Sequence, residues 1–161
     1  MDQKNIKLKK IISGGQTGVD QIALDFAISQ SIPIGGFCPR GRLCESGIIP
    51  QKYTLVETES EDYQVRTMRN VQESDGTLII YDKEMKNGTL FTYEFCRKIE
   101  RPVYLAVISG HEKNDPVKFK RWISEHQIQI LNIAGPRASE EVSPIRVKKL
   151  LQYLFGIIDY L

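Results

Sequence analysis

The chain lacks both a disulfide framework and a long apolar run. Its three cysteines, Cys38, Cys44 and Cys96, are an odd and sparse set among 161 residues, so we expect reduced thiols that serve packing. No apolar stretch approaches the ~20 residues of a membrane-spanning helix, and the basic start has too short an apolar part for a signal peptide. We therefore expect a cytoplasmic protein that forms one domain over residues 1–161.

Histidine is equally scarce, and neither sign of charge is in large excess. His111 and His126 stand outside any HExxH or paired arrangement. The spacing of Cys38 and Cys44 is wider than the roughly two to four residues that separate zinc ligands. We therefore expect no metal held by protein side chains. The formal net charge of +2 is too small to indicate a nucleic-acid or membrane partner.

What the sequence does have is an alternation of short apolar runs and segments with helical periodicity. This alternation predicts right-handed βαβ units and a parallel sheet covered on both faces. We expect a single Rossmann-like three-layer α/β domain with a mostly parallel sheet of about five to seven strands. Pro33 places the second strand at a sheet edge, and Ser60 is the expected cap of the second helix. The expected strands span 8–12, 31–37, 53–58, 76–82, 102–109 and 128–135, and the expected helices start near Val19, span 61–73, 88–99 and 115–127, and start near Pro144.

The most informative segment is IISGGQTGVD, residues 11–20. It joins the first expected strand to the first helix, which places it at the carboxyl end of a strand, where ligands bind in open α/β sheets. Gly14, Gly15 and Gly18 allow close approach of the backbone, and the helix start offers free N–H groups to an anion. The spacing matches neither GxxxxGK[ST] nor GxGxxG. The loop predicts either a phosphate site or a tight turn, and a side chain at Gly15 should either occupy the ligand's place or require an unsuitable backbone angle.

A second segment, KNGTLFTYEF, repeats this arrangement. Gly88 and Thr89 follow the strand expected at 76–82 and open a helix that carries Thr92 and Glu94. Two glycine-marked helix starts at one sheet edge favour a ligand that bears phosphate. Arginine suits bidentate phosphate recognition, although an ordinary surface loop is an equal reading for the arginines around Gly41. Further candidates for the crevice are Arg40, Gly41, Arg42, Arg66, Arg69, Asn70, Gly135, Pro136 and Arg137.

Several of these segments together resemble a known family. ISGGQTGVDQIALDFAI, IPIGGFCPRGR, RTMRNVQESDGTLII, NGTLFTYE and LNIAGPR closely resemble the putative molybdenum carrier family, in order, from about residue 10 to residue 137. That family is similar to a Rossmann-like group with the "lonely guy" phosphoribohydrolases and the DNA-processing protein A domain. The resemblance implies a nucleotide-type ligand or molybdenum cofactor, a pterin with a phosphate. It also implies a crevice formed by Gly14, Gly15, Gln16, Thr17, Gly18, Asp20, Gly88, Thr89 and Glu94.

Two classes of function stay open. One is a non-catalytic carrier or sensor that binds a small phosphorylated molecule, and it is compatible with a homo-oligomer. The other is a phosphoribohydrolase-like or other nucleotide-processing hydrolase, which needs a carboxylate acting on the leaving group or on water; Asp20, Asp75 and Glu94 are the candidates. The phosphoribohydrolases carry PGGxGTxxE, whereas Glu94 comes two positions later here, which turns its carboxylate by about 200° on a helix. We therefore do not carry hydrolase activity over.

Overall fold

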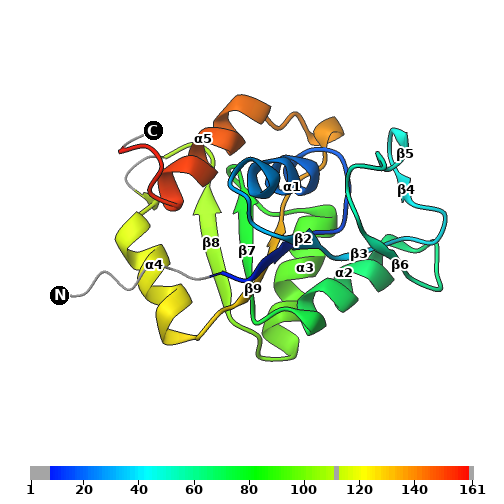
Figure 1. Ribbon diagram of the computed structural model, residues 1–161, viewed down its shortest axis with the longest axis horizontal. Helices are drawn as coiled ribbons and strands as arrows, with labels where there is room; N and C mark the ends of the chain where they lie inside the picture. The colour runs from blue at the N-terminus through cyan, green and yellow to red at the C-terminus, as the bar shows by residue number, and fades with distance from the viewer. Residues whose placement is uncertain (1–7, 111–112, 160–161) are drawn as a thin grey trace.

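The last strand of the chain lies at the centre of the main sheet. The computed structural model describes residues 8–110 and 113–159. Its main sheet contains β1 (Lys10–Ile12), β2 (Ile34–Gly35), β7 (Gly76–Tyr81), β8 (Val103–Val107) and β9 (Ile130–Ala134). The order is β2-β1-β9-β7-β8, and every neighbouring pair is parallel. Figure 1 shows β9 between β1 and β7, so the strands on either side of it are joined only through it.

Helices cover both faces of this sheet. The first face carries α1 (Val19–Ser29), α4 (Pro116–Glu125) and α5 (Pro144–Leu154). The second face carries α2 (Tyr63–Glu73) and α3 (Asn87–Lys98), which pack against each other (Figure 1). This is the Rossmann-like three-layer α/β fold that the sequence predicts, with five strands in the main sheet.

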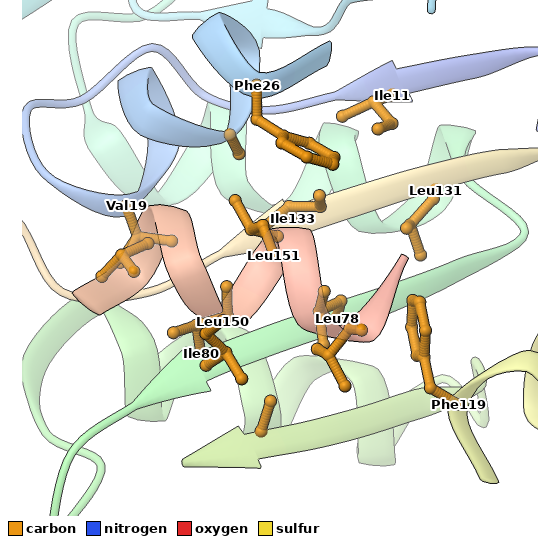
Figure 2. Close-up of a cluster of buried hydrophobic side chains, with 14 of the residues drawn as sticks. Ile11, Val19, Phe26, Leu78, Ile80, Phe119, Leu131, Ile133, Leu150 and Leu151 are labelled. Atoms are coloured by element: carbon orange, nitrogen blue, oxygen red, sulfur yellow. The ribbon is translucent and has the colours of Figure 1, made fainter. Parts of the chain in front are cut away.

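The larger hydrophobic core lies between the sheet and the first group of helices. Leu78 and Ile80 of β7 are fully buried against it. The apolar residues of α5 recur at i, i+3, i+4 and i+7 from Val147, which forms one stripe along the helix. Figure 2 shows Leu150 and Leu151 of this stripe pointing toward the strands. Burial of each such side chain stabilises the fold by about 1.5–3 kcal/mol.

The expected strand 31–37 is broken in two at Gly36. Gly36 has φ 124°, and a Cβ there would lie 2.2 Å from the carbonyl oxygen of Ser13. The chain therefore leaves the main sheet after β2 and continues as β3 (Phe37–Cys38), which pairs in parallel with β6 (Val56–Glu57) in a separate two-stranded sheet. The edge position expected from Pro33 is confirmed, because β2 is the outermost strand of the main sheet.

The expected cap of α2 is wrong. The Asp62 carboxylate accepts the N–H of Gln64 at 2.8 Å and caps the helix. The Ser60 hydroxyl instead accepts the N–H of Asp62 at 3.0 Å, so it shapes the turn before the helix. The helix consequently begins at Tyr63 rather than at residue 61.

Two other features concern the remaining loops and the cysteines. An antiparallel hairpin of β4 (Leu43–Cys44) and β5 (Gly47–Ile48) was not predicted. All three cysteines are free and buried, as expected.

Within residues 8–110 and 113–159, none of the helices has the length and apolar character needed to cross a bilayer.

Truncation of Leu150 should be costly. Leu150 is fully buried, so Leu150→Ala should lower the free energy of unfolding by about 2–5 kcal/mol through lost burial and a residual cavity. Urea denaturation measures this loss. The control is Ile145→Ala in the same helix; Ile145 is 68% exposed and its loss should stay within about 0.5 kcal/mol. Equal losses in the two variants would contradict this description of the core.

Candidate functional site

A cleft of about 350 Å³ opens at the carboxyl edge of the sheet. Its walls come from the loop after β1, from α2, from the first turns of α3 and from the segment after β9. This is the edge at which ligands bind in open α/β folds. The lining residues are Gln16, Asp20, Tyr63, Gln64, Arg66, Thr67, Asn87, Gly88, Thr89, Phe91, Thr92, Ala134, Gly135, Arg137 and Glu140.

The glycine-rich loop closes around a carboxylate of the protein itself. Asp20 is only 3% exposed, and its Oδ2 accepts the N–H of Gln16 at 3.1 Å. The N–H of Thr17 donates to the side-chain oxygen of Gln16 at 3.0 Å, and the N–H of Val19 donates to the carbonyl of Pro136 at 3.1 Å. These N–H groups, which the sequence suggested for an anion, already have protein acceptors.

Asp20 and Arg66 form a buried pair beside this loop. Burial raises the pKa of the Asp20 carboxyl, while the Arg66 guanidinium and the backbone amides of Gln16 and Gly14 act in the opposite direction. The Arg66 Nη1 lies 3.6 Å from the Asp20 Oδ2. A Cβ at Gly14 would come within 2.3 Å of the same Nη1. A side chain at Gly14 would therefore displace the guanidinium.

Arg66 has donor groups that the protein leaves unused. Its side chain is 13% exposed, and its buried Nε has no hydrogen-bond partner among the described residues. The 3.6 Å contact with Asp20 is longer than an ordinary N–H···O hydrogen bond. The Tyr63 ring packs against the guanidinium, 5.7 Å from its carbon to the ring centroid. A guanidinium has five N–H donors, so Arg66 brings spare donors and a positive charge to the cleft.

The first turn of α3 presents a second set of donors. The side chain of its cap residue, Lys86, forms no cap hydrogen bond. Thr89 is 4% exposed, and its hydroxyl has no partner within the part of the chain that the structure describes. A Cβ at Gly88 would meet no atom within 4 Å, so the space beside it is open. An uncapped helix start favours a bound anion.

The β4–β5 hairpin braces this cleft from outside. The Glu45 carboxylate, in the hairpin turn, accepts hydrogen bonds from the Thr17 hydroxyl and from the N–H and hydroxyl of Ser139, the latter two at 3.0 and 2.6 Å. Its own N–H donates to the side-chain oxygen of Gln16 at 2.9 Å. Glu45 thus ties the loop after β1 to the segment after β9, and it holds Gln16 at the cleft wall.

Only some of the residues predicted from the sequence line the cleft. Gly15 and Gly18 lie beside it with φ of 78° and 80°. A Cβ at Gly15 would meet Ile49 and Leu55 at 2.8 and 2.6 Å. The sequence left two reasons for a glycine at position 15: a side chain would take the ligand's place, or it would require an unsuitable backbone angle. The structure supports the second reason, and a side chain would also clash with Ile49 and Leu55. The predicted residues that do line the cleft are Gln16, Asp20, Arg66, Gly88, Thr89, Thr92, Gly135 and Arg137.

The predicted residues of the 40–42 loop lie elsewhere. Arg40 is exposed, with its Nη2 3.8 Å from Glu61. The N–H of Gly41 donates to the Glu57 carboxylate at 2.6 Å. Arg42 donates to carbonyl oxygens further along the same excursion of the chain. The structure does not bring these residues to the cleft.

Asn70 and Arg69 face β3 rather than the cleft. The Asn70 side chain accepts from the N–H of Phe37 at 2.8 Å and donates to its carbonyl at 2.9 Å. The Arg69 guanidinium lies over the Phe37 ring, 4.6 Å from its centroid. Both residues therefore hold the small β3–β6 sheet against α2.

Two of the three carboxylates considered for catalysis lie outside the cleft. Asp75 is at the amino end of β7, where its Oδ2 accepts the N–H groups of Gln129 and Ile130 at 3.0 and 2.8 Å. Glu94 is on α3 but exposed. Asp20 is the candidate that reaches the cleft.

Several residues that line the cleft were not predicted, although their spacing along α2 and α3 places them on the same helical faces as predicted residues. Tyr63 and Thr67 share a helical face with Arg66, and Phe91 lies one turn after Gly88. Extending the helical period from those two predicted residues would have found them. The other lining residues that were not predicted are Gln64, Asn87, Ala134 and Glu140.

The fold and the cleft together define a Rossmann-like α/β ligand-binding domain. The chain belongs to the circularly permutated YpsA SLOG family, whose profile matches residues 11–154. Its structure is similar to the crystal structure of a putative molybdenum carrier protein from Syntrophus aciditrophicus SB, with 42% sequence identity, a TM-score of 0.87, and coverage of 92% of this chain and 95% of that chain. None of the curated proteins matches the chain. The family resemblance seen in the sequence is thereby confirmed.

The hairpin contact should respond to acid. Hydrogen bonds from Ser139 and Thr17 lower the pKa of Glu45, so the ionised carboxylate stabilises the folded state above the unfolded pKa of about 4.3. This contribution is lost as the pH falls through the lower folded pKa. The free energy of unfolding of the wild type should exceed that of Glu45→Gln at pH 7, and the gap should shrink below about pH 4. Urea denaturation at each pH measures it, and a gap independent of pH would contradict this role.

Proposed function

We propose that the chain binds a small phosphate-bearing molecule of nucleotide or pterin type, as a carrier or sensor. The ligand lies in the cleft at the carboxyl edge of the sheet, which we call the first cleft. The observation that carries the proposal is the Arg66 guanidinium, 13% exposed and without a hydrogen-bond partner for its buried Nε among the described residues. A buried donor without an acceptor is unfavourable. A phosphate beside the guanidinium would supply the opposite charge and accept hydrogen bonds from its remaining N–H donors.

The start of α3 supports the same ligand chemistry. Gly88, Thr89 and Thr92 line the cleft that contains Arg66. The unpartnered Thr89 hydroxyl and the uncapped helix start would donate to phosphate oxygens. In this proposal the phosphate lies at the start of α3 instead of at the 14–18 loop, because the N–H groups of Gln16, Thr17 and Val19 have protein acceptors.

The molybdenum cofactor is one ligand of this type. The neighbour from Syntrophus aciditrophicus SB is described as a putative molybdenum carrier. The spare donors of Arg66 and Thr89 suit the phosphate of such a pterin. Among the described residues, no group of three or more His, Cys, Asp and Glu side chains is placed to hold a metal ion. The prediction that protein side chains hold no metal stays a prediction.

Binding is better supported than hydrolysis. Asp75 and Glu94 lie away from the cleft, and the Asp20 Oδ2 accepts the N–H of Gln16. The Asp20 carboxylate is also buried and paired with Arg66, which favours a structural role over action on a leaving group or on water. The proposal includes a cytoplasmic setting, which the free, buried thiols support because cysteines stay reduced there. A homo-oligomer stays a prediction.

Mass spectrometry of small molecules released from the purified, denatured protein tests the ligand class. A phosphorylated pterin or nucleotide, present in an amount comparable to the protein, would support the proposal. Isothermal titration with inorganic phosphate and with the released compound then gives the affinity. Purified protein that releases no phosphorylated compound and does not bind one in titration would contradict it.

Thr89→Val separates binding from folding. Because the Thr89 hydroxyl has no partner, its removal should leave the free energy of unfolding unchanged or raise it by up to about 1 kcal/mol. The affinity for the phosphorylated ligand should fall roughly 10-fold, since a hydrogen bond to a charged group is lost. Equal affinity in the wild type and the variant would contradict the placement of the phosphate.

Arg66→Gln should weaken binding further, by roughly 10- to 100-fold, because it removes the positive charge as well as donors. Arg69→Gln is the matched control on the same helix, since its guanidinium lies over Phe37. Its affinity should match that of the wild type. Melting temperatures of both variants without ligand show whether the fold stays stable when the buried Asp20 loses its charged partner.

A further inference from the structure

A second cleft of about 360 Å³ adjoins the first and has no role in the proposed function so far. Thr89 and Glu140 line both clefts, so a ligand held at the start of α3 can extend into either. The Glu140 carboxylate accepts from the Asn87 side chain at 2.9 Å and from the N–H of Arg137 at 3.0 Å. The two clefts are therefore neighbours, and the hydrogen-bonded side chain of Glu140 lies between them.

The interior of the second cleft differs chemically from its rim. Asp82, the first residue after β7, is half-buried, and one of its carboxylate oxygens accepts a hydrogen bond from the Ser109 hydroxyl. The apolar lining is Ile108, Pro136 and Val142. The charged rim residues are exposed and of both signs, so water screens them; they are Lys83, Glu84, Lys86, Glu141 and Arg146.

The unpartnered Thr89 hydroxyl is a hydrogen-bonding group that belongs to both clefts. Thr89 is 4% exposed, and the described residues offer its hydroxyl no partner. It lies where the two clefts meet. The cleft that Thr89 shares with Arg66 offers spare donors, and the cleft that it shares with Asp82 offers a carboxylate acceptor.

We propose that Asp82 binds the N–H edge of the ligand's heterocycle, while Arg66 and Thr89 bind its phosphate; this rests on the proposed function. Guanine and pterin rings each carry an N–H next to an amino group, and both can donate to one carboxylate. Adenine pairs its amino group with a ring nitrogen that accepts, which a carboxylate repels. The apolar lining suits the faces of such a ring. Asp82 therefore selects guanine or pterin phosphates over adenine phosphates.

Titration of the full chain with three probes tests this selection. The probes are guanosine 5′-monophosphate, adenosine 5′-monophosphate and inorganic phosphate. The wild type should bind the guanosine compound at least 10-fold more tightly than the adenosine compound, because a site built to accept hydrogen bonds rejects a ligand that lacks the donors. Asp82→Asn should reduce guanosine affinity about 10-fold or more and leave the affinity for inorganic phosphate unchanged.

Three controls keep the outcomes distinct. Glu125→Gln, an exposed change of the same kind on α4, should alter no affinity. Ser109→Ala removes the hydroxyl that orients Asp82 and should lower guanosine affinity in the same direction, so it serves if Asp82→Asn does not fold. Replacing ribose by deoxyribose in the guanosine probe should change little; a large loss would mean that Asp82 binds a sugar diol, which overturns the proposal.

The two proposals fail in different ways. Equal binding of the guanosine and adenosine compounds by the wild type, or a guanosine preference that survives in both Asp82→Asn and Ser109→Ala, overturns the role of Asp82 and leaves phosphate binding intact. If the wild type binds none of the three probes and no phosphorylated pterin, phosphate binding itself fails, and the role of Asp82 fails with it.

Discussion

The buried carboxylate of Asp20 is the constraint on which the cleft depends. A carboxylate withdrawn from water needs hydrogen bonds or an opposite charge close by, and here the loop after β1 supplies an amide while α2 supplies Arg66. The need for both fixes the path of the 14–18 loop and keeps a guanidinium at the sheet edge. Because the Asp20–Arg66 contact is 3.6 Å long, the charges attract each other without using up the donors of the guanidinium.

The layers of the fold could be predicted because each element carries its own periodicity. The apolar run of β7 and the stripe of α5 from Val147 are local signals, and both appear in the structure. The order of the strands could not be predicted, because nothing local in residues 130–134 says that β9 pairs with both β1 and β7. The break at Gly36 was hidden for the same reason: the oxygen that excludes a Cβ belongs to Ser13, far along the chain.

The site could be predicted best where a motif and a helix start coincide. Gly88 and Thr89 satisfy both conditions and line the cleft. Gly15 shows the limit of the method, because a glycine with positive φ looks the same in a sequence whether it faces a ligand or, as here, Ile49 and Leu55. Asp75 shows another limit, since position next to a strand does not tell which edge of the sheet a carboxylate serves until the pairing with residues 129–130 is known.

The central position of β9 also has a consequence during synthesis on the ribosome. Until residues 130–134 leave the exit tunnel, the nascent chain has two separate pairs of strands, β2-β1 and β7-β8, each with an open edge. Such edges attract other chains, and pairings between distant segments form slowly. Because Ala134, Gly135, Arg137 and Glu140 line the cleft, the cleft becomes complete only after residue 140 has been made. A ligand can stabilise the protein only from that stage on.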